Sequence, residues 1–167
     1  GRVLTAATGK TLGELTSEWL WKPMGAEHDA FWCTAQDGQA SAYFCFNASL
    51  RDWGRLGLLL ARDGQWGEQQ IIPRDYLLDA TDATRQPGAF APGRATPYFG
   101  YGYQFWLHPL RSRTFAMQGV HGQSVFVQPE SGIVMVQTAV YTGASGLQDP
   151  SAYMERTSMW MGVLQSL

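Results

Sequence analysis

Residues 115–140, FAMQGVHGQSVFVQPESGIVMVQTAV, hold three β-rich runs separated by two short turn signals. Gly119-Val120-His121-Gly122 separates the first run from the second, and the Pro-x-x-Gly turn at 129–132 predicts a tight hairpin before the third. The third run is apolar from Ile133 to Val136, so we expect a strand covered on both faces. Together the runs predict an antiparallel meander, with strands at Phe115–Met117, Ser124–Gln128 and Ile133–Val140.

Helical signals surround this meander on both sides. Thr11-Leu12-Gly13-Glu14 and Ser49-Leu50-Arg51-Asp52 are capping-box patterns, and each is followed by apolar residues at helical spacing. Asp149-Pro150 supplies an N-cap and a first-turn proline for a terminal helix. Helices are therefore expected from Gly1 to Thr8, from Thr11 to Lys22, from Ser49 to the stop at Asp63-Gly64, from Pro73 to Asp79, and from Asp149 onward.

Two further segments complete the prediction of the fold. Ala30–Phe46 shows no sustained period and contains Asp37-Gly38, so we interpret it as loop and short strand. Tyr98–Trp106 alternates aromatic with small or polar residues, as a strand half exposed to a cavity would. Helices, then a meander, then a closing helix, without an internal repeat, predict an α+β fold: an antiparallel sheet with flanking helices.

The composition fits one globular domain over 1–167, with no second domain. The chain has 167 residues, of which 45% are hydrophobic and 16% charged, which is too apolar for disorder. Its longest apolar runs are far shorter than the roughly 20 residues of a membrane span, so no span is expected. A net charge of −2 without a basic cluster argues against nucleic acid and anionic membranes as partners. No targeting segment can be read after Gly1, which leaves cytoplasm and periplasm both compatible.

Cysteine and metal chemistry find little support in the sequence. Cys33 and Cys45 lack the spacing of a zinc or redox pair, and free thiols are favoured over a disulfide between them, although both states stay open. Glu27-His28-Asp29 has ligand-type side chains, but adjacent residues do not converge on one ion, so a solvated turn is favoured. The GxSxG, HExxH, P-loop and GxGxxG motifs are absent. We expect no metal and no cofactor.

His121 is the most informative of the histidines, since it lies between Gly119 and Gly122. Glycines let a backbone approach a ligand closely, so neighbouring N–H groups could serve as oxyanion donors. A Ser/His/Asp arrangement with His28, His108 or His121 as the base is a second hypothesis. Periodicity alone favours a plain turn beside a surface imidazole.

Four stretches form an ordered set: Gly9–Leu12, Leu20–Ala30, Ser49–Gly57, and Gly119–Gln123 with the downstream Pro129. Read together, they resemble the penicillin-recognising serine hydrolases over nearly the whole chain. The resemblance is nearest to class C β-lactamase-like esterases and amidases, the branch that includes 6-aminohexanoate-dimer hydrolase. It implies a β-lactamase-like fold and a serine hydrolase that cleaves an ester or amide bond of a small molecule through an acyl-enzyme.

The resemblance also implies that part of the enzyme lies outside these residues. The family's Ser-x-x-Lys nucleophile motif and its Tyr motif precede the segment similar to Gly9–Leu12, and this sequence holds neither. Its only lysines are Lys10 and Lys22, and no serine precedes either by three positions. We therefore expect 1–167 to be the C-terminal part of a serine β-lactamase-like domain, with the missing N-terminal part of the same enzyme as its partner.

The resemblance places the family's third motif, usually Lys-Thr-Gly or His-x-Gly, on Met117-Gln118-Gly119. Met117 replaces the usual Lys or His, which disfavours penicillin carboxylate recognition and favours a less charged ester or amide. By the same count the Val120 N–H is the oxyanion donor, the one catalytic group assigned to this chain. The implied substrate-binding residues are Met117, Gln118, Gly119, His121, Gly122, Tyr101 and Tyr141.

Aromatic side chains are expected to form the wall of the pocket, although a buried aromatic core is an equal alternative for half of them. A non-catalytic binding module that stacks sugar or peptide on Trp and Tyr faces explains the composition equally well. It does not explain the order of capped helices, Gly-His-Gly turn and closing helix. A catalytically dead relative used for recognition also stays open. The wall candidates are Tyr98, Tyr101, Tyr103, Trp106 and the Tyr141–Gln148 loop.

Overall fold

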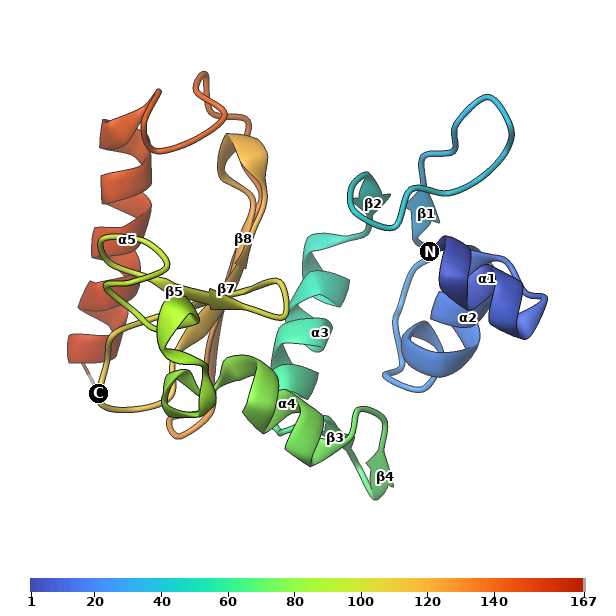
Figure 1. Ribbon diagram of the computed structural model, residues 1–167, viewed down its shortest axis with the longest axis horizontal. Coiled ribbons are helices and arrows are strands. Elements are labelled where there is room, and N and C mark those ends of the chain that lie inside the picture. Colours follow the sequence, from blue (N-terminus) through green and yellow to red (C-terminus); the bar gives the residue numbers. More distant parts are fainter. Residues whose placement is uncertain (167) are drawn as a thin grey trace. The chain divides into compact units, whose positions relative to one another are not determined.

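The computed structural model describes residues 1–166, which form two compact units (Figure 1). The first unit covers Gly1–Leu56 and the second begins at Gly57, so the boundary falls inside helix α3 (Leu50–Ala61). The single domain expected from the sequence stays a prediction. Within residues 1–166, no helix is both long and apolar enough to cross a membrane.

The first unit begins with two short helices whose ends agree with the sequence signals. α1 (Arg2–Thr8) ends at Gly9, which has a φ of 70°, a left-handed conformation that favours glycine. α2 (Leu12–Thr16) begins at Thr11, whose hydroxyl accepts from the Glu14 N–H at 3.2 Å. The Glu14 carboxylate in turn accepts from the Thr11 N–H at 2.7 Å, so the capping box is confirmed. The helix continues as a π-helical turn, η1 (Ser17–Trp21).

A two-stranded ladder of β1 (Phe31–Trp32) and β2 (Phe46–Asn47) confirms the expected short strand. Its register pairs Trp32 with Phe46, which places the next residue, Cys33, opposite Cys45. The Cys33 N–H donates to the Cys45 carbonyl at 3.1 Å, and the two residues form a disulfide with Cα atoms 5.4 Å apart. The preference for free thiols is therefore wrong, because the strand register that joins the cysteines cannot be read from their spacing.

Aromatic rings gather around Phe46 in the first unit. Trp32 lies tilted against this ring at a centroid distance of 4.5 Å, while Trp21 and Trp53 meet it edge-on at 5.2 and 5.6 Å. Edge-to-face contacts match the positive edge of one ring to the negative face of the other. The cluster therefore packs β2 against η1 and the first half of α3.

The second unit is built on a five-stranded antiparallel sheet in which the strands follow chain order. This sheet and the helices around it confirm the α+β fold predicted from the sequence. The strands are β5 (Gly100–Gly102), β6 (Phe105–Leu107), β7 (Phe115–Gln118), β8 (Ser124–Gln128) and β9 (Ile133–Gln137). The remaining elements are β3 (Gln65–Trp66), β4 (Gln69–Gln70), α4 (Arg74–Thr81), η2 (Ala83–Arg85), η3 (Gly88–Phe90), η4 (Val120–Gly122) and α5 (Pro150–Gln165).

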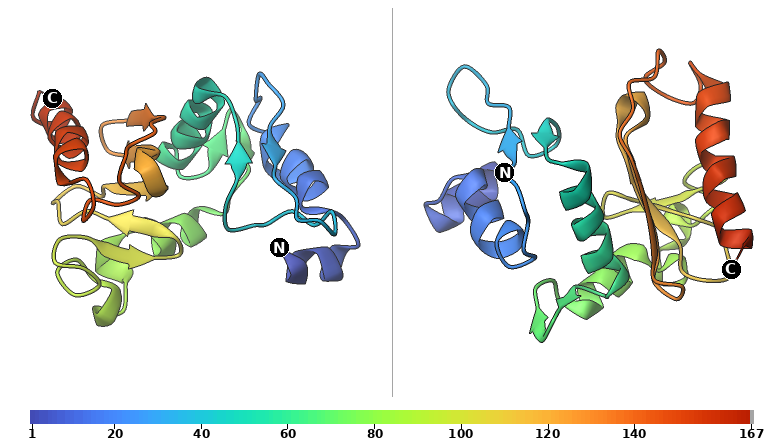
Figure 2. Two further views of the ribbon diagram at one scale, coloured as in Figure 1. Left: turned by 90° about the horizontal axis from the view of Figure 1, so that it is seen from above. Right: turned by 180° about the vertical axis from the view of Figure 1, so that it is seen from behind.

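Helices cover both faces of this sheet. α5 lies along one face (Figures 1 and 2), where the Trp160 ring stacks on Phe126 at a centroid distance of 5.4 Å. Gly57 of α3 approaches the other face so closely that a Cβ there would lie 2.4 Å from a Val134 methyl and 3.1 Å from a Val125 methyl. Each helix thus packs closely on its face of the sheet. α5 does so through the large Trp160 ring, and α3 does so because Gly57 has no side chain.

Two strand predictions need correction. Ile133–Gln137 is half-buried rather than covered on both faces, and it ends before Val140. β9 pairs only with β8 in the part of the chain that the structure describes, so it stands at the edge of the sheet. Tyr98–Trp106 forms a hairpin instead of one strand, because Tyr103 and Gln104 have φ values of 51° and 71° and turn the chain between β5 and β6.

Candidate functional site

The candidate site begins where β7 ends. Gln118 pairs with Ser124 of β8, and the Gly119 N–H donates to the Gln123 carbonyl at 2.9 Å, which closes the connection between the two strands. Inside this closed loop, η4 exposes its first residue: 66% of the Val120 surface is accessible. Within residues 1–166 the Val120 N–H has no hydrogen-bond acceptor. The loop directly after β7 therefore offers a backbone donor that has no acceptor among residues 1–166.

The two residues that follow Val120 both have left-handed backbone conformations. His121 has a φ of 61°, and Gly122 has a φ of 97°. A Cβ at Gly122 would lie 2.5 Å from the Tyr141 ring, so only glycine fits at this position. The His121 N–H donates to the Ala144 carbonyl at 3.2 Å and the Tyr141 N–H donates to the His121 carbonyl at 2.9 Å. η4 is thereby fastened to the loop that precedes α5.

A cavity of about 810 Å³ lies beside the Val120 loop. Side chains from the sheet and from α5 line it, and most of them are apolar or aromatic, a composition typical of small-molecule sites. The lining includes Gln118, Gly119 and Val120 at the end of β7, Tyr98, Phe99 and Trp106 from the β5–β6 region, Ala144–Gly146 from the following loop, and Tyr153, Met154, Arg156 and Thr157 from α5.

The predicted site residues divide into two groups. Gln118, Gly119 and Val120 line the cavity together, and Tyr98, Trp106 and part of the Tyr141–Gln148 loop contribute to its wall. The residues outside the cavity lining are Met117, His121, Gly122, Tyr101, Tyr103 and Tyr141. For the members of both groups, the role in substrate binding or catalysis stays a prediction.

Several of the predicted site residues that lie outside the cavity wall form hydrogen bonds with neighbouring residues instead. His121 Nδ1 lies 2.9 Å from the Tyr141 carbonyl oxygen. A carbonyl only accepts, so Nδ1 carries the proton and the imidazole acts here as a clamp on the Tyr141 backbone. The Tyr101 hydroxyl donates to Gln104 Oε1 at 2.9 Å, across the β5–β6 turn. The Tyr141 hydroxyl accepts from Gln137 Nε2 at 2.6 Å.

Arg156 lines the cavity, and the sequence patterns do not indicate it. It is 4% exposed and donates to Ser124 Oγ and to Gln118 Oε1. Burial lowers the pKa of its guanidinium from the ordinary arginine value. The helical periodicity of α5 could place Arg156 on a face, but its partners lie more than 30 positions earlier in the chain, so no local signal points to them.

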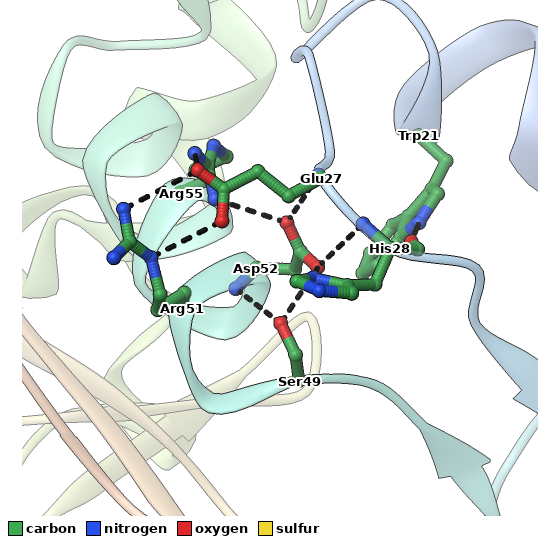
Figure 3. Close-up of polar contacts among 7 residues, drawn as sticks. All are labelled: Trp21, Glu27, His28, Ser49, Arg51, Asp52 and Arg55. Atoms are coloured by element: carbon green, nitrogen blue, oxygen red, sulfur yellow. Dashed lines mark hydrogen bonds and ion pairs between the residues drawn. The ribbon is translucent and has the colours of Figure 1, made fainter.

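A second polar cluster lies in the first unit around Asp52, whose side chain is fully buried (Figure 3). Its carboxylate accepts from the Glu27 N–H at 2.8 Å, the His28 N–H at 3.2 Å and the Ser49 hydroxyl at 2.7 Å. Arg55 Nη1 donates to it at 3.1 Å. Burial alone would raise the pKa of Asp52, but these donors outweigh it and hold the pKa below the ordinary value.

The Asp52 cluster fastens the Glu27-His28 turn to the start of α3. Glu27 pairs with both Arg51 and Arg55, and Trp21 Nε1 donates to the His28 carbonyl at 2.8 Å (Figure 3). Every oxygen of Asp52 is occupied by a donor from the protein itself, which is the arrangement of a structural anchor. Across residues 1–166, no three His, Cys, Asp or Glu side chains gather as a metal site.

A family-wide sequence model of the beta-lactamases matches residues 1–151. The chain belongs to the beta-lactamase family. Members of this family are typically serine hydrolases of the penicillin-recognising superfamily. The resemblance drawn from the ordered motifs is therefore confirmed. Among curated proteins, none is found to match the chain.

Solved structures of related proteins share the fold. A Bacillus anthracis protein assigned as a 6-aminohexanoate-dimer hydrolase is 26% identical and superposes with a TM-score of 0.83, over 99% of this chain and 42% of its own. A penicillin-binding protein homologue from Caulobacter crescentus has a TM-score of 0.59 at 17% identity, covering 87% of this chain and 51% of its own. A Bacteroides dorei protein assigned as a beta-lactamase has a TM-score of 0.58 at 18% identity, covering 93% and 54%.

This beta-lactamase-family chain spans about half the length of the solved relatives, or less. The Bacillus anthracis protein extends well beyond the part that superposes on residues 1–167. The activity of a complete enzyme therefore has to be inferred from the residues that this chain contributes.

Proposed function

We propose that this chain contributes the third-motif strand and much of the pocket wall of a serine hydrolase that cleaves an ester or amide bond through an acyl-enzyme. The observation that carries the proposal is the exposed, unpaired Val120 N–H at the edge of the apolar cavity. Membership of the beta-lactamase family and the likeness to a protein assigned as a 6-aminohexanoate-dimer hydrolase support the reaction class.

In the proposed reaction, the nucleophilic serine and its Lys and Tyr partners come from a segment outside these 167 residues. The serine oxygen attacks the carbonyl carbon, and the carbonyl oxygen becomes an anion that accepts a hydrogen bond from the Val120 N–H. Collapse of the tetrahedral intermediate expels the alcohol or amine, which leaves with a proton. Water then attacks the acyl-enzyme and releases the acid.

The substrate is proposed to be a small ester or amide without a charge near Met117. The resemblance places Met117 at the position of the family's usual Lys or His, and a methionine offers no cationic partner for a carboxylate. The cavity beside the Val120 loop is lined largely by aromatic and aliphatic side chains such as Phe99, Trp106 and Met154. An uncharged acyl or leaving group fits such a wall without the cost of burying a charge.

The Val120 donor is tested by removing its N–H in the complete enzyme. Val120→Pro deletes the donor and should lower the turnover of p-nitrophenyl acetate by about 100-fold or more, because a single oxyanion donor contributes that much. Val120→Ala is the matched control, since it shortens the exposed side chain and keeps the N–H. Circular dichroism checks that both variants fold. Near-normal turnover in a folded Val120→Pro enzyme would remove Val120 from the oxyanion hole.

A further inference from the structure

The Val120 N–H lies between two fixed points of the backbone. One residue earlier, the Gly119 N–H donates to the Gln123 carbonyl at 2.9 Å and closes the loop on itself. One residue later, His121 is bonded to a different segment, the loop 141–144 that precedes α5. Because a peptide unit is planar and rigid, the direction of its N–H follows from the dihedral angles of the residues beside it. The aim of the Val120 donor therefore depends on how firmly both neighbours are held.

His121 makes three hydrogen bonds to the loop 141–144. Its N–H donates to the Ala144 carbonyl at 3.2 Å, and its carbonyl accepts from the Tyr141 N–H at 2.9 Å. Its Nδ1–H donates to the Tyr141 carbonyl at 2.9 Å, so backbone and side chain hold the same partner. The Tyr153 hydroxyl also donates to the Ala144 carbonyl, at 2.9 Å, and connects this loop to α5. The imidazole therefore adds a third attachment between η4 and a loop that is itself fastened to a helix.

The backbone conformation of His121 also points to a role of its side chain. Its φ of 61° lies in the left-handed region, which glycine adopts without strain and other residues adopt at a cost. Such a conformation persists where the surrounding contacts over-determine it, and it is frequent at active sites. A glycine at this position could make both backbone bonds to the loop 141–144 without strain, but not the bond from Nδ1. The contribution peculiar to histidine is therefore the side-chain clamp.

We propose that His121 is a positioning residue, whose Nδ1–H bond to the Tyr141 carbonyl holds η4 so that the Val120 N–H points at the oxyanion. The imidazole neither contacts the substrate nor transfers a proton. His121 is not among the residues that line the cavity, which agrees with an indirect role. The inference rests on the proposed hydrolase function, and it adds a residue that acts on the oxyanion only through the backbone of Val120.

Three variants of the complete enzyme separate the clamp from the backbone conformation. His121→Gly keeps the left-handed conformation and removes the clamp. His121→Asn also tolerates this conformation, and its side-chain nitrogen is as many bonds from the backbone as Nδ1 and donates as Nδ1 does. Gln70→Ala is the matched control, because Gln70 Nε2 likewise donates to two backbone carbonyls, those of Asp63 and Ile72, but lies outside the cavity lining.

The hydrolysis of p-nitrophenyl acetate gives the kinetic readout, with active sites counted by a fluorophosphonate so that unfolded protein does not enter the comparison. His121→Gly should lower kcat by about 5- to 50-fold, less than deletion of the Val120 donor does. KM should change by less than about threefold, because the oxyanion forms only after the ester is bound. His121→Asn should lose less than about threefold, and Gln70→Ala should match the wild type.

Two kinetic outcomes would contradict the positioning role. One is an unchanged kcat in His121→Gly, and the other is an equal loss in His121→Gly and His121→Asn. If His121→Gly does not fold, His121→Asp takes its place, since aspartate has the size of asparagine but its carboxylate cannot donate to a carbonyl. This variant should be slowed by at least the same factor, and full activity in it would likewise refute the clamp.

Crystal structures of the wild type, His121→Gly and His121→Asn give a readout that does not depend on activity. We expect residues 119–122 to keep one conformation in the wild type and in His121→Asn, and to shift or occupy several in His121→Gly. If the wild type cleaves no ester or amide while this loop shifts in His121→Gly, the clamp is supported and the hydrolase proposal fails. If the wild type is active and neither the loop nor kcat changes in His121→Gly, the positioning role is refuted and the hydrolase proposal stands.

Discussion

His108, directly after β6, shows how a single buried residue can restrict the mechanism. Its side chain is 2% exposed and is surrounded by the rings of Phe99, Phe126 and Tyr98 at 4.8, 5.8 and 6.2 Å. Neither ring nitrogen has a partner within residues 1–166. Burial, and then the positive charge of Arg156, lower the pKa of His108 to about 4. A pKa this low makes the imidazole a weak proton acceptor, and the surrounding rings bury it, which argues against His108 as a general base.

The depressed pKa predicts a pH-dependent stability. The unfolded chain binds a proton at His108 near pH 6.5 and the folded chain only near pH 4, so stability is complete above the unfolded pKa and falls as the pH drops through this window. Between pH 7.5 and pH 4.5 this group should remove on the order of 2 to 3 kcal/mol from the free energy of unfolding.

Urea unfolding of the wild type and of His108→Leu at both pH values measures this effect. Leucine cannot take up a proton, so the variant should lose about 2 to 3 kcal/mol less than the wild type when the pH is lowered. Other titrating groups are shared by the two proteins and cancel in the difference. Equal losses in both proteins would show that the His108 pKa is not depressed.

At this scale, residues that follow from ordered motifs can be located from the sequence, whereas contacts between distant residues cannot. The catalytic and substrate-binding roles of the located residues stay predictions. Gln118, Gly119 and Val120 could be located by counting from Gly122 and Pro129. Asp52 was recognised as part of a capping box, but its bonds to the Glu27 and His28 N–H groups cross some 25 positions. Arg156 was not recognised, since its acceptors lie on strands whose register with α5 has no local signal.

α3 illustrates the element scale, because two of its glycines stand in opposite environments. A Cβ at Gly57 would lie 2.4 Å from a Val134 methyl, while a Cβ at Gly54 would meet nothing within 4 Å. Valine is β-branched and has little rotameric freedom with which to yield. The close approach of α3 to β9 therefore depends on Gly57, whereas Gly54 is free to carry a side chain.

The two glycines give a matched pair of substitutions. Gly54→Ala should stabilise the protein by about 0.5 to 1 kcal/mol, the usual gain when alanine replaces a helical glycine and the added Cβ meets no neighbour. Gly57→Ala should destabilise it, because overpacking costs about 1 to 3 kcal/mol and exceeds the same gain in helix propensity. Urea unfolding midpoints measure both. A Gly57→Ala protein as stable as Gly54→Ala would contradict the packing of α3 on the sheet.

Elements with strong local signals were predicted well, and those set by turns or pairing were not. The Thr11–Glu14 capping box, the Pro-x-x-Gly hairpin and the Asp149-Pro150 start of α5 are all local, and the structure contains them. At Ser49–Asp52 only half of the expected capping box forms: the Asp52 N–H donates to the Ser49 hydroxyl at 3.1 Å. The β5–β6 hairpin turns at Tyr103 and Gln104, which are not the Asn or Gly that usually mark a left-handed turn. The Cys33–Cys45 disulfide depends on the β1–β2 register.

At the scale of the whole molecule, the order of several weak motifs is enough to identify the family. Which catalytic groups come from this chain, and which from a segment outside it, stays a proposal. The beta-lactamase match covers residues 1–151, and the Bacillus anthracis relative superposes over 99% of this chain. The sequence holds no Ser-x-x-Lys motif. In the proposed function, this chain binds and orients the carbonyl, and the nucleophile comes from a segment outside residues 1–167.

Labelling with a fluorophosphonate probe, followed by mass-spectrometric mapping of the modified serine, directly tests whether the nucleophile lies outside residues 1–167. We predict that residues 1–167 alone are not labelled and do not hydrolyse p-nitrophenyl acetate. Combined with an N-terminal fragment that carries Ser-x-x-Lys, they should restore hydrolysis, with the label on the serine of that fragment. Hydrolysis by residues 1–167 alone, with the label on a serine within them and activity abolished by changing that serine to alanine, would contradict the proposal.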